Sequence, residues 1–293
     1  MRKRAFKLAL VGFWLMCFCQ ILAVVPAHFP VATDFELVNG MVIVQAELDG
    51  HLANFILDTG APMMILNEKG TESTDFQANS LQGGMAGSWK TIEMFAWAGV
   101  RKFDLRALTT DIGALETVTN RPIAGLIGYD FLEDVELVMD FERQLITLLP
   151  QGSTAKLEGW SLKSQVPFTM AGHLPVIEAK IGQVKLRLGL DTGANINLLN
   201  INKANELDAE LATPVNNAGM LGMSGSSFKT FAADVIETNL GGLNFRDMRF
   251  VFADISHLQN LVDNEVDGLL GFPFFKSGKF SLNYAAQTIS IWE

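Results

Sequence analysis

Two stretches of this chain are almost alike: "FILDTGAPMMILN" at residues 55–67 and "LGLDTGANINLLN" at residues 188–200. Each carries one acidic residue, Asp58 or Asp191, at the end of an apolar run and directly before Thr-Gly-Ala. Glycine lets the backbone turn sharply and approach another chain segment closely, because it has no Cβ. A carboxylate held beside an apolar core loses hydration, and its pKa rises unless N–H donors surround it. One such tripeptide is more often an ordinary turn, so it is the second copy that favours a functional interpretation.

The similarity between the two halves continues beyond these stretches. Residues 123–132, "IAGLIGYDFL", match residues 266–275, "VDGLLGFPFF", and residues 140–148 match residues 283–291 in the same order. An internal repeat has to be recognised first, because it determines how the motifs inside it are interpreted. We therefore expect two structurally similar halves.

Most of each half has the sequence pattern of β-structure. Short apolar or alternating runs are separated by turn residues, and Asp49-Gly50 lies between two such runs, as is typical of a tight hairpin. The exception is residues 201–211, where three apolar residues recur at the spacing of a helix. The sequence predicts an all-β fold with two similar β-barrel lobes.

The N-terminal segment differs from the rest of the chain. Basic residues precede the apolar run Leu8 to Val25, and Val25-Pro26-Ala27 offers a cleavage point, which is typical of a signal peptide or of an N-terminal membrane anchor. The protein is therefore expected to be exported, periplasmic or extracellular, and to touch a membrane only through this segment if it stays uncleaved. Both cysteines, Cys17 and Cys19, fall inside it.

Composition and segment boundaries complete the predicted organisation. With 49% apolar and 18% charged residues the chain is globular, and its net charge of −10 argues against nucleic acid and anionic lipid as partners. Residues after Pro150 have the Gly, Ser and charge content of a linker. The predicted segments are the signal peptide or anchor (1–27), the first lobe (28–150), the linker (151–164) and the second lobe (165–293).

Pairing of the two halves would bring Asp58 and Asp191 into one site. Two carboxylates that share a site cannot both ionise cheaply, so one of them keeps a proton. The pair then contains a base and an acid at the same pH. Hydrolysis of an amide by water needs both, because one group takes a proton from water while the other supports the carbonyl oxygen.

The sequence resembles the aspartic peptidases, whose halves each carry Asp-Thr-Gly followed by a hydrophobic-hydrophobic-Gly element. Here these elements are Asp58-Thr59-Gly60 with Leu126-Ile127-Gly128, and Asp191-Thr192-Gly193 with Leu269-Leu270-Gly271. The resemblance implies a bilobal aspartic-protease fold with the cleft between the lobes and catalysis by Asp58 and Asp191. It also implies that Thr59, Gly60, Thr192 and Gly193 support the dyad. A peptide or protein is the expected substrate, with no metal or other cofactor, and the fused halves are expected to work as a monomer.

The family also has a mobile hairpin, or flap, over the cleft. The candidate segments are residues 83–90 and 222–229. The predicted flap or substrate-binding residues are Gly84, Met85, Gly87, Trp89, Gly222, Met223, Gly225 and Phe228. An ordinary glycine-rich surface turn is the alternative interpretation of both segments.

Departures from the family pattern make the chain resemble two fused retropepsin-type halves more than a pepsin. Ala61 and Ala194 follow the glycines, where pepsins usually have a hydroxyl residue that helps hold the Asp ionised. The dyad is therefore expected to titrate higher than in a pepsin. Neither tyrosine, Tyr129 or Tyr284, lies in a candidate flap.

Two other classes of function stay open. A catalytically inactive pseudoprotease would keep the cleft and bind peptides or a partner protein, and a purely structural β-scaffold would need neither carboxylate. The acidic segment at residues 263–268 lacks the closing Glu of a calcium loop, and the four histidines show no ligand spacing. No Gly-x-Ser-x-Gly nucleophile motif is present.

Overall fold

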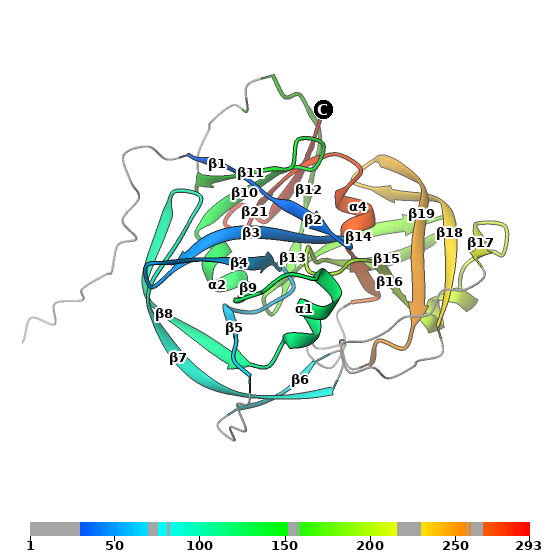
Figure 1. Ribbon diagram of the computed structural model, residues 1–293. Coiled ribbons are helices and arrows are strands. Elements are labelled where there is room, and N and C mark those ends of the chain that lie inside the picture. Colours follow the sequence, from blue (N-terminus) through cyan, green and yellow to red (C-terminus); the bar gives the residue numbers. More distant parts are fainter. Residues whose placement is uncertain are drawn as a thin grey trace, which may run out of the picture.

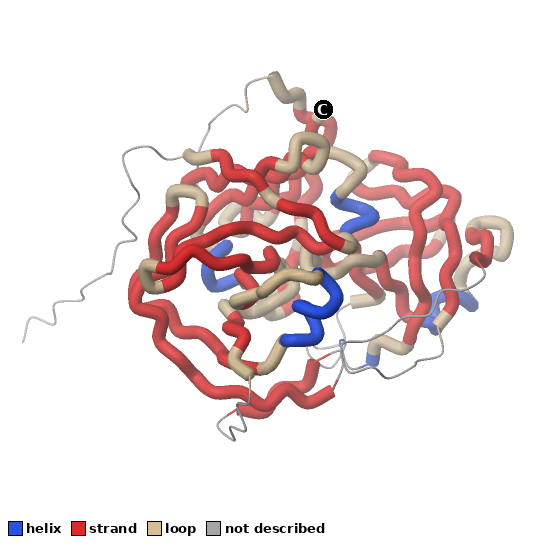
Figure 2. The backbone as a smooth tube through the Cα atoms, viewed as in Figure 1, coloured by secondary structure: helices blue, strands red, loops and turns tan. Residues whose placement is uncertain are grey.

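The computed structural model describes residues 30–69, 76–80, 83–151, 157, 159–215, 230–256, 258 and 266–293. Strands dominate this part of the chain, and the predicted all-β bilobal fold is confirmed (Figure 1 and Figure 2). One lobe holds the blue, cyan and early green strands of Figure 1, and the other holds the late green to orange strands. The N-terminal segment 1–27 lies outside the described residues. Within the described ranges, no helix combines the length and the apolar character needed to cross a bilayer.

The first lobe is a sheet that closes on itself. Its strand order is β2 (Glu36–Val38), β3 (Met41–Leu48), β4 (His51–Leu57), β9 (Gly125–Ile127), β5 (Ile65–Asn67), β8 (Val100–Thr110), β7 (Gly83–Trp97) and β6 (Phe76–Ser80). An additional pairing between β3 and β7 closes the barrel. The hairpin predicted at Asp49-Gly50 is confirmed, because both residues have positive φ and Leu48 pairs with His51.

The second lobe repeats this arrangement. Its order is β13 (Thr169–Ala171), β14 (Leu174–Ile181), β15 (Val184–Leu190), β20 (Gly268–Leu270), β16 (Asn197–Asn200), β19 (Leu243–Ala253), β18 (Phe231–Leu240) and β17 (Ala212–Val215). The pairing of β14 with β18 closes this barrel. Strand for strand the order is that of the first lobe, as the matching sequence blocks predict.

A third sheet joins the lobes. Its order is β1 (Ala32–Asp34), β11 (Leu145–Pro150), β10 (Val135–Asp140), β21 (Lys279–Asn283), β22 (Thr288–Trp292) and β12 (Leu162–Pro167). The central pair, β10 with β21, consists of equivalent strands from the two halves, and Val138 lies opposite Ser281. The lobes therefore share a hydrogen-bonded platform. Its last strand, β12, begins at Leu162, inside the segment predicted as linker 151–164.

Short helices complete the described structure: α1 (Gly113–Thr119), α2 (Tyr129–Leu132), η1 (Ile201–Asn205) and α4 (Phe272–Phe275). Of the helix predicted within 201–211, only the five-residue 3-10 helix η1 forms. Leu207 and Leu211 still pack on the core. The spacing of the apolar residues therefore indicates which side chains are buried, although no continuous helix forms.

The main hydrophobic core runs through both lobes and the sheet between them. It is rich in aromatic side chains, and the rings of Phe274 and Phe280 lie 4.8 Å apart. Phe131 and Phe275, on α2 and α4, are fully buried. These helices directly follow the Leu-Ile-Gly and Leu-Leu-Gly elements, so core packing fixes the segments that lie behind the two Asp-Thr-Gly loops.

Candidate active site

Each Asp-Thr-Gly loop leaves the end of a buried strand. Asp58 follows β4, and its N–H donates to the carbonyl oxygen of Ile127 at 3.0 Å. Asp191 follows β15, and its N–H donates to the carbonyl oxygen of Leu270 at 3.0 Å. In both lobes the partner is a short parallel strand, β9 or β20. The hydrophobic-hydrophobic-Gly elements therefore lie beside the Asp loops, as the family resemblance implies.

The two threonines connect the loops across the lobe boundary. The N–H of Thr59 donates to Oγ1 of Thr192 at 3.1 Å, and the N–H of Thr192 donates to Oγ1 of Thr59 at 2.9 Å. Each hydroxyl in turn donates to the backbone of the opposite strand, to Leu190 or Leu57, at 2.9 Å. Thr59 and Thr192 are almost completely buried. Four reciprocal hydrogen bonds in a dry environment hold the loops in register.

Replacing Thr192 by valine tests this connection. Valine has nearly the same shape but no hydroxyl, so the N–H of Thr59 loses its acceptor and the Leu57 carbonyl loses its donor. Leaving buried polar groups unpaired is expected to lower the free energy of unfolding by about 2–4 kcal/mol. Urea denaturation of Thr192→Val beside Thr213→Val, an exposed strand position, measures the difference. Equal stability of the two variants would contradict the role assigned to the hydroxyl.

The carboxyl groups of the two Asp residues face each other's glycine. A Cβ added to Gly60 would lie 2.7 Å from Cγ of Asp191, and one added to Gly193 would lie 2.5 Å from Cγ of Asp58. Only a residue without a side chain allows this approach. Both Asp residues remain partly exposed, so the pair is open to solvent on one side.

Backbone donors surround each carboxyl group. The N–H of Gly60 donates to Oδ1 of Asp58 at 2.9 Å, and the N–H of Gly193 donates to Oδ1 of Asp191 at 2.8 Å. Burial is nevertheless the largest influence and raises the pKa of Asp58 well above its usual range, with further increases from the charge of Asp191 and the hydrogen bond to it. Burial also raises the pKa of Asp191, and donors that include Asp58 oppose this rise. Both carboxyl groups therefore bind a proton more tightly than an ordinary carboxyl group, and the pKa of Asp58 is raised further than that of Asp191.

Asp130 is a supporting residue that sequence reasoning did not identify. Its Oδ1 accepts a hydrogen bond from the N–H of Met64 at 2.9 Å, which ties α2 to the segment after the first Asp loop. Burial raises its pKa to about 6, against the opposing effect of the Met64 N–H and the charge of Lys102. The repeat gives no signal for this residue, because the matching position of the second half is Pro273.

His173 also contacts the site. It precedes β14 in the second lobe, and its Nε2 lies 2.7 Å from the carbonyl oxygen of Gly60 in the first. Burial lowers its pKa. No metal-ligand spacing marks this histidine in the sequence, and the contact joins residues that are 113 positions apart.

The first predicted flap segment lies along β7, which pairs with β6 as a hairpin. Ser80 of β6 pairs with Gly83 of β7, and Gly84 and Met85 lie on β7. Gly87 is buried, and a Cβ on it would lie 2.5 Å from the carbonyl oxygen of Thr109, so close packing on β8 explains this glycine.

The remaining flap candidates are placed in part. The guanidinium carbon of Arg106 lies 3.8 Å from the centre of the Trp89 ring, so this tryptophan stacks on the neighbouring strand. Gly222, Met223, Gly225 and Phe228 lie outside the described residues. The substrate-binding role of all these residues stays a prediction.

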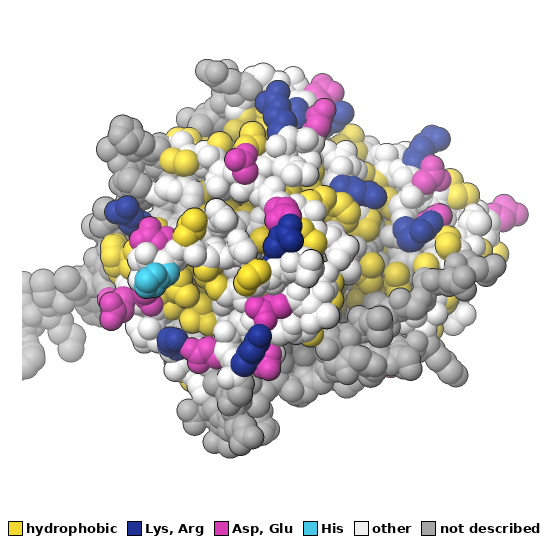
Figure 3. All heavy atoms as spheres, viewed as in Figure 1, with side chains coloured by type: hydrophobic (Ala, Val, Ile, Leu, Met, Phe, Trp, Pro, Cys, Tyr) yellow, Lys and Arg dark blue, Asp and Glu magenta, His cyan; other side chains and the backbone are white. Residues whose placement is uncertain are grey.

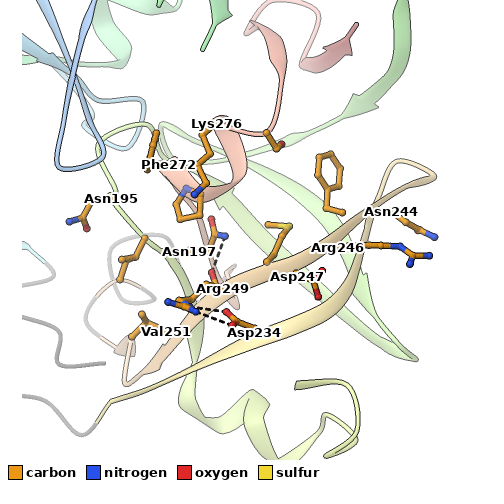
Figure 4. Close-up of a pocket in the computed structure, with 15 residues that line it drawn as sticks. Asn195, Asn197, Asp234, Asn244, Arg246, Asp247, Arg249, Val251, Phe272 and Lys276 are labelled. Carbon is orange, nitrogen blue, oxygen red and sulfur yellow. Dashed lines mark hydrogen bonds and ion pairs between the residues drawn. The ribbon is translucent and has the colours of Figure 1, made fainter. Parts of the chain in front are cut away.

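An open groove of about 880 Å³ runs along the outside of the second lobe (Figure 4). The groove follows β19 and α4 and reaches Asn195, two residues beyond Gly193, but neither Asp58 nor Asp191 lines it. Arg249 and Asp234 form a two-pronged ion pair on its wall, at 2.7 Å and 2.9 Å. Among the described residues on the face drawn in Figure 3, acidic and basic side chains lie interspersed.

Two closed β-barrels, a sheet shared between them and a pair of facing carboxyl groups define a bilobal fold with a candidate acid–base site. Residues 177–274 match the sequence model of a protein family described as aspartyl protease. The matched residues lie in the second lobe, and they support the resemblance of this chain to the aspartic peptidases. No curated protein matches the chain.

Proposed function

We propose that this protein is an exported aspartic endopeptidase, in which Asp58 and Asp191 activate a water molecule for hydrolysis of a peptide bond. The observation that carries the proposal is the reciprocal placement of each carboxyl group against the glycine of the other loop. Binding alone does not require two carboxyl groups to be buried side by side, because such a pair is costly to keep in a folded protein.

We assign different roles to the two residues, because each faces the other's loop and the pKa of Asp58 is raised more strongly. Asp191, the ionised partner, accepts a proton from water as the water oxygen attacks the carbonyl carbon of the substrate. Asp58, the protonated partner, donates its proton to the carbonyl oxygen, so no negative charge accumulates there. Asp191 then gives its proton to the amide nitrogen while Asp58 takes a proton back from a hydroxyl of the gem-diol. The C–N bond breaks, the carboxylic acid product forms, and the dyad again holds one proton.

The rate of peptide hydrolysis should depend on pH as a bell-shaped curve. Activity falls on the acidic side when Asp191 gains a proton, and on the basic side when Asp58 loses its proton. Because burial raises both pKa values, we expect the maximum at a higher pH than two ordinary carboxyl groups would give. The curve is measured as kcat/KM, obtained from initial rates of cleavage of an unfolded protein substrate between pH 3 and pH 8. A rate that keeps falling from pH 3 upward would contradict the raised values.

Cleavage of an unfolded protein substrate by purified protein is the direct test of the function. Fragments from internal positions, identified by mass, would support an endopeptidase, and stepwise shortening from one end would indicate an exopeptidase instead. If the substrate is bound but never cut at any pH, the chain is a binding protein with a peptidase fold.

Export is a separate part of the proposal and rests on the basic and apolar N-terminal sequence. Fractionation of the producing cells tests export. The mass of the exported protein is then compared with that of the full chain. A mass that lacks the first residues indicates a cleaved signal peptide, and a full-length mass in the membrane fraction indicates an anchor. Full-length protein in the cytoplasm would disprove export.

A further inference from the structure

His173 connects the second lobe to the catalytic loop of the first. It lies in the turn between β13 and β14, next to Gly172, whose φ of 61° bends the chain there. Its Nε2 is 2.7 Å from the carbonyl oxygen of Gly60. Because a carbonyl oxygen can only accept a hydrogen bond, Nε2 must carry a proton and donate.

The contact of His173 with the Gly60 carbonyl has no counterpart at the equivalent position of the first lobe. The spacing that relates Asp58 to Asp191 relates Gly40 to His173, and Gly40 has no side chain to offer. The turn of the first lobe instead packs directly on the second loop, since a Cβ on Gly40 would lie 3.0 Å from Cβ of Asn195. The two catalytic loops, otherwise alike, therefore differ in what holds the carbonyl group of their glycine.

The carbonyl group that His173 contacts belongs to the peptide unit between Gly60 and Ala61. The N–H of that same unit, on Ala61, donates to the backbone carbonyl oxygen of Asp58 at 3.2 Å. From this position it also lowers the pKa of the Asp58 carboxyl group. A peptide whose carbonyl accepts a hydrogen bond becomes a stronger donor at its N–H. In the second lobe the N–H of Ala194 acts on Asp191 in the same way.

We propose that His173 is a positioning residue, which fixes and polarises the peptide unit between Gly60 and Ala61 and so strengthens the donor that faces Asp58. The residue touches neither carboxyl group and acts through the backbone. Asp58 is the partner that burial and the charge of Asp191 drive furthest toward the protonated form. A stronger donor opposes that drive and keeps Asp58 able to release its proton during turnover. Only this consequence for turnover rests on the proposed function.

Two influences on His173 itself make the inference testable in the wild-type protein. Burial lowers the pKa of its imidazole, and the bond to the Gly60 carbonyl raises it. When the imidazole gains a proton it becomes a charged donor, and hydrogen bonds from charged donors are roughly twice as strong as neutral ones. Protonation of His173 should therefore be detected at the N–H of Ala61.

The first experiment is an NMR titration of the full wild-type protein. The imidazole signals of His173 report its protonation, and the amide proton shifts of Ala61 and Ala194 are followed in the same samples. We expect the Ala61 signal to move downfield in step with the titration of His173, while Ala194, the matched position, does not follow that step. If both amides move alike, or neither follows His173, the proposal is wrong. Because no turnover is needed, this result does not depend on peptidase activity.

The second experiment compares His173→Leu, which cannot donate, with His173→Gln, whose amide group can. For His173→Leu we expect kcat to fall severalfold with KM nearly unchanged, and the basic limb of the pH profile to move up by about half a pH unit. His173→Gln should recover most of both changes. His51→Gln, at an exposed hairpin position, controls for loss of a histidine elsewhere. Equal profiles for the leucine and glutamine variants would overturn the proposal.

Discussion

Replacing Asp191 by asparagine is expected to reduce kcat/KM for peptide cleavage by at least about 10³-fold, and Asp58→Asn should do the same, because each removes one half of the acid–base pair. Asparagine can still accept the hydrogen bond from Gly193 or Gly60, so the loop geometry survives. What is lost is the ability to exchange a proton with water or with the substrate. Cleavage of an unfolded substrate across pH 3 to pH 8 measures the effect.

Asp104→Asn and Asp247→Asn are the matched controls for these two variants. Both residues are exposed, occupy equivalent positions on strands β8 and β19, and have a positive φ, a conformation that asparagine accepts readily. Both controls should keep wild-type activity. If Asp58→Asn and Asp191→Asn also keep it, the dyad has no part in the chemistry.

Asp58→Asn, which should lower activity, should raise the stability of the folded protein near pH 7. In the folded protein the raised pKa of Asp58 means that this group binds a proton more tightly than in the unfolded chain, so its contribution to stability is greatest at low pH. That contribution is lost as the pH rises above the unfolded value of roughly 4. Asp58→Asn should therefore resist urea better than the wild type near pH 7, and this advantage should disappear below about pH 4. A variant that loses activity while gaining stability cannot be explained by misfolding.

Sequence reasoning predicts the elements that the repeat presents twice. The hairpin at Asp49-Gly50 follows from local turn preferences, and the facing positions of Asp58 and Asp191 follow from pairing of two similar halves. Both depend on patterns that are short in sequence or that recur at a fixed spacing.

Features that depend on contact between distant segments carry no such signal. The sheet that joins the lobes pairs β10 with β21, and either strand alone has the pattern of any buried strand. His173 contacts a backbone carbonyl, which any residue could offer, and its counterpart in the repeat is the side-chain-free Gly40. Asp130 corresponds to Pro273 in the sequence repeat, so comparison of the two halves does not identify Asp130 either. The asymmetric parts of the site are those that the repeat cannot predict.

The glycines at residues 83–90 show a different limit. They lie along β7, and close contact with β8 accounts for Gly87. Their role in a flap stays a prediction. A glycine in sequence indicates either conformational freedom or close approach, and only the packing around it distinguishes the two.

Gly193→Ala is expected to lower the rate of peptide cleavage by roughly 10²-fold through a single methyl group. The added Cβ would lie 2.5 Å from Cγ of Asp58 and 2.6 Å from its Oδ1, well inside van der Waals contact. The clash is with a group that cannot move away freely, because the N–H of Gly60 holds Oδ1 of Asp58 at 2.9 Å. Overpacking of this kind costs about 1–3 kcal/mol of stability. Displacing a catalytic group by about an ångström lowers activity by roughly 10²-fold.

Gly278→Ala separates this effect from the general cost of replacing a glycine. Gly278 also has no positive φ, and a Cβ there would meet only ordinary contacts, the nearest at 3.8 Å from the ring of Phe280. This control should match the wild type in both activity and urea midpoint. Gly60→Ala, which places the same methyl group 2.7 Å from Cγ of Asp191, should reproduce the loss from the other side. If either dyad variant, Gly60→Ala or Gly193→Ala, retained full activity, the two carboxyl groups could not be as close as this geometry requires, and a shared proton between them would be excluded.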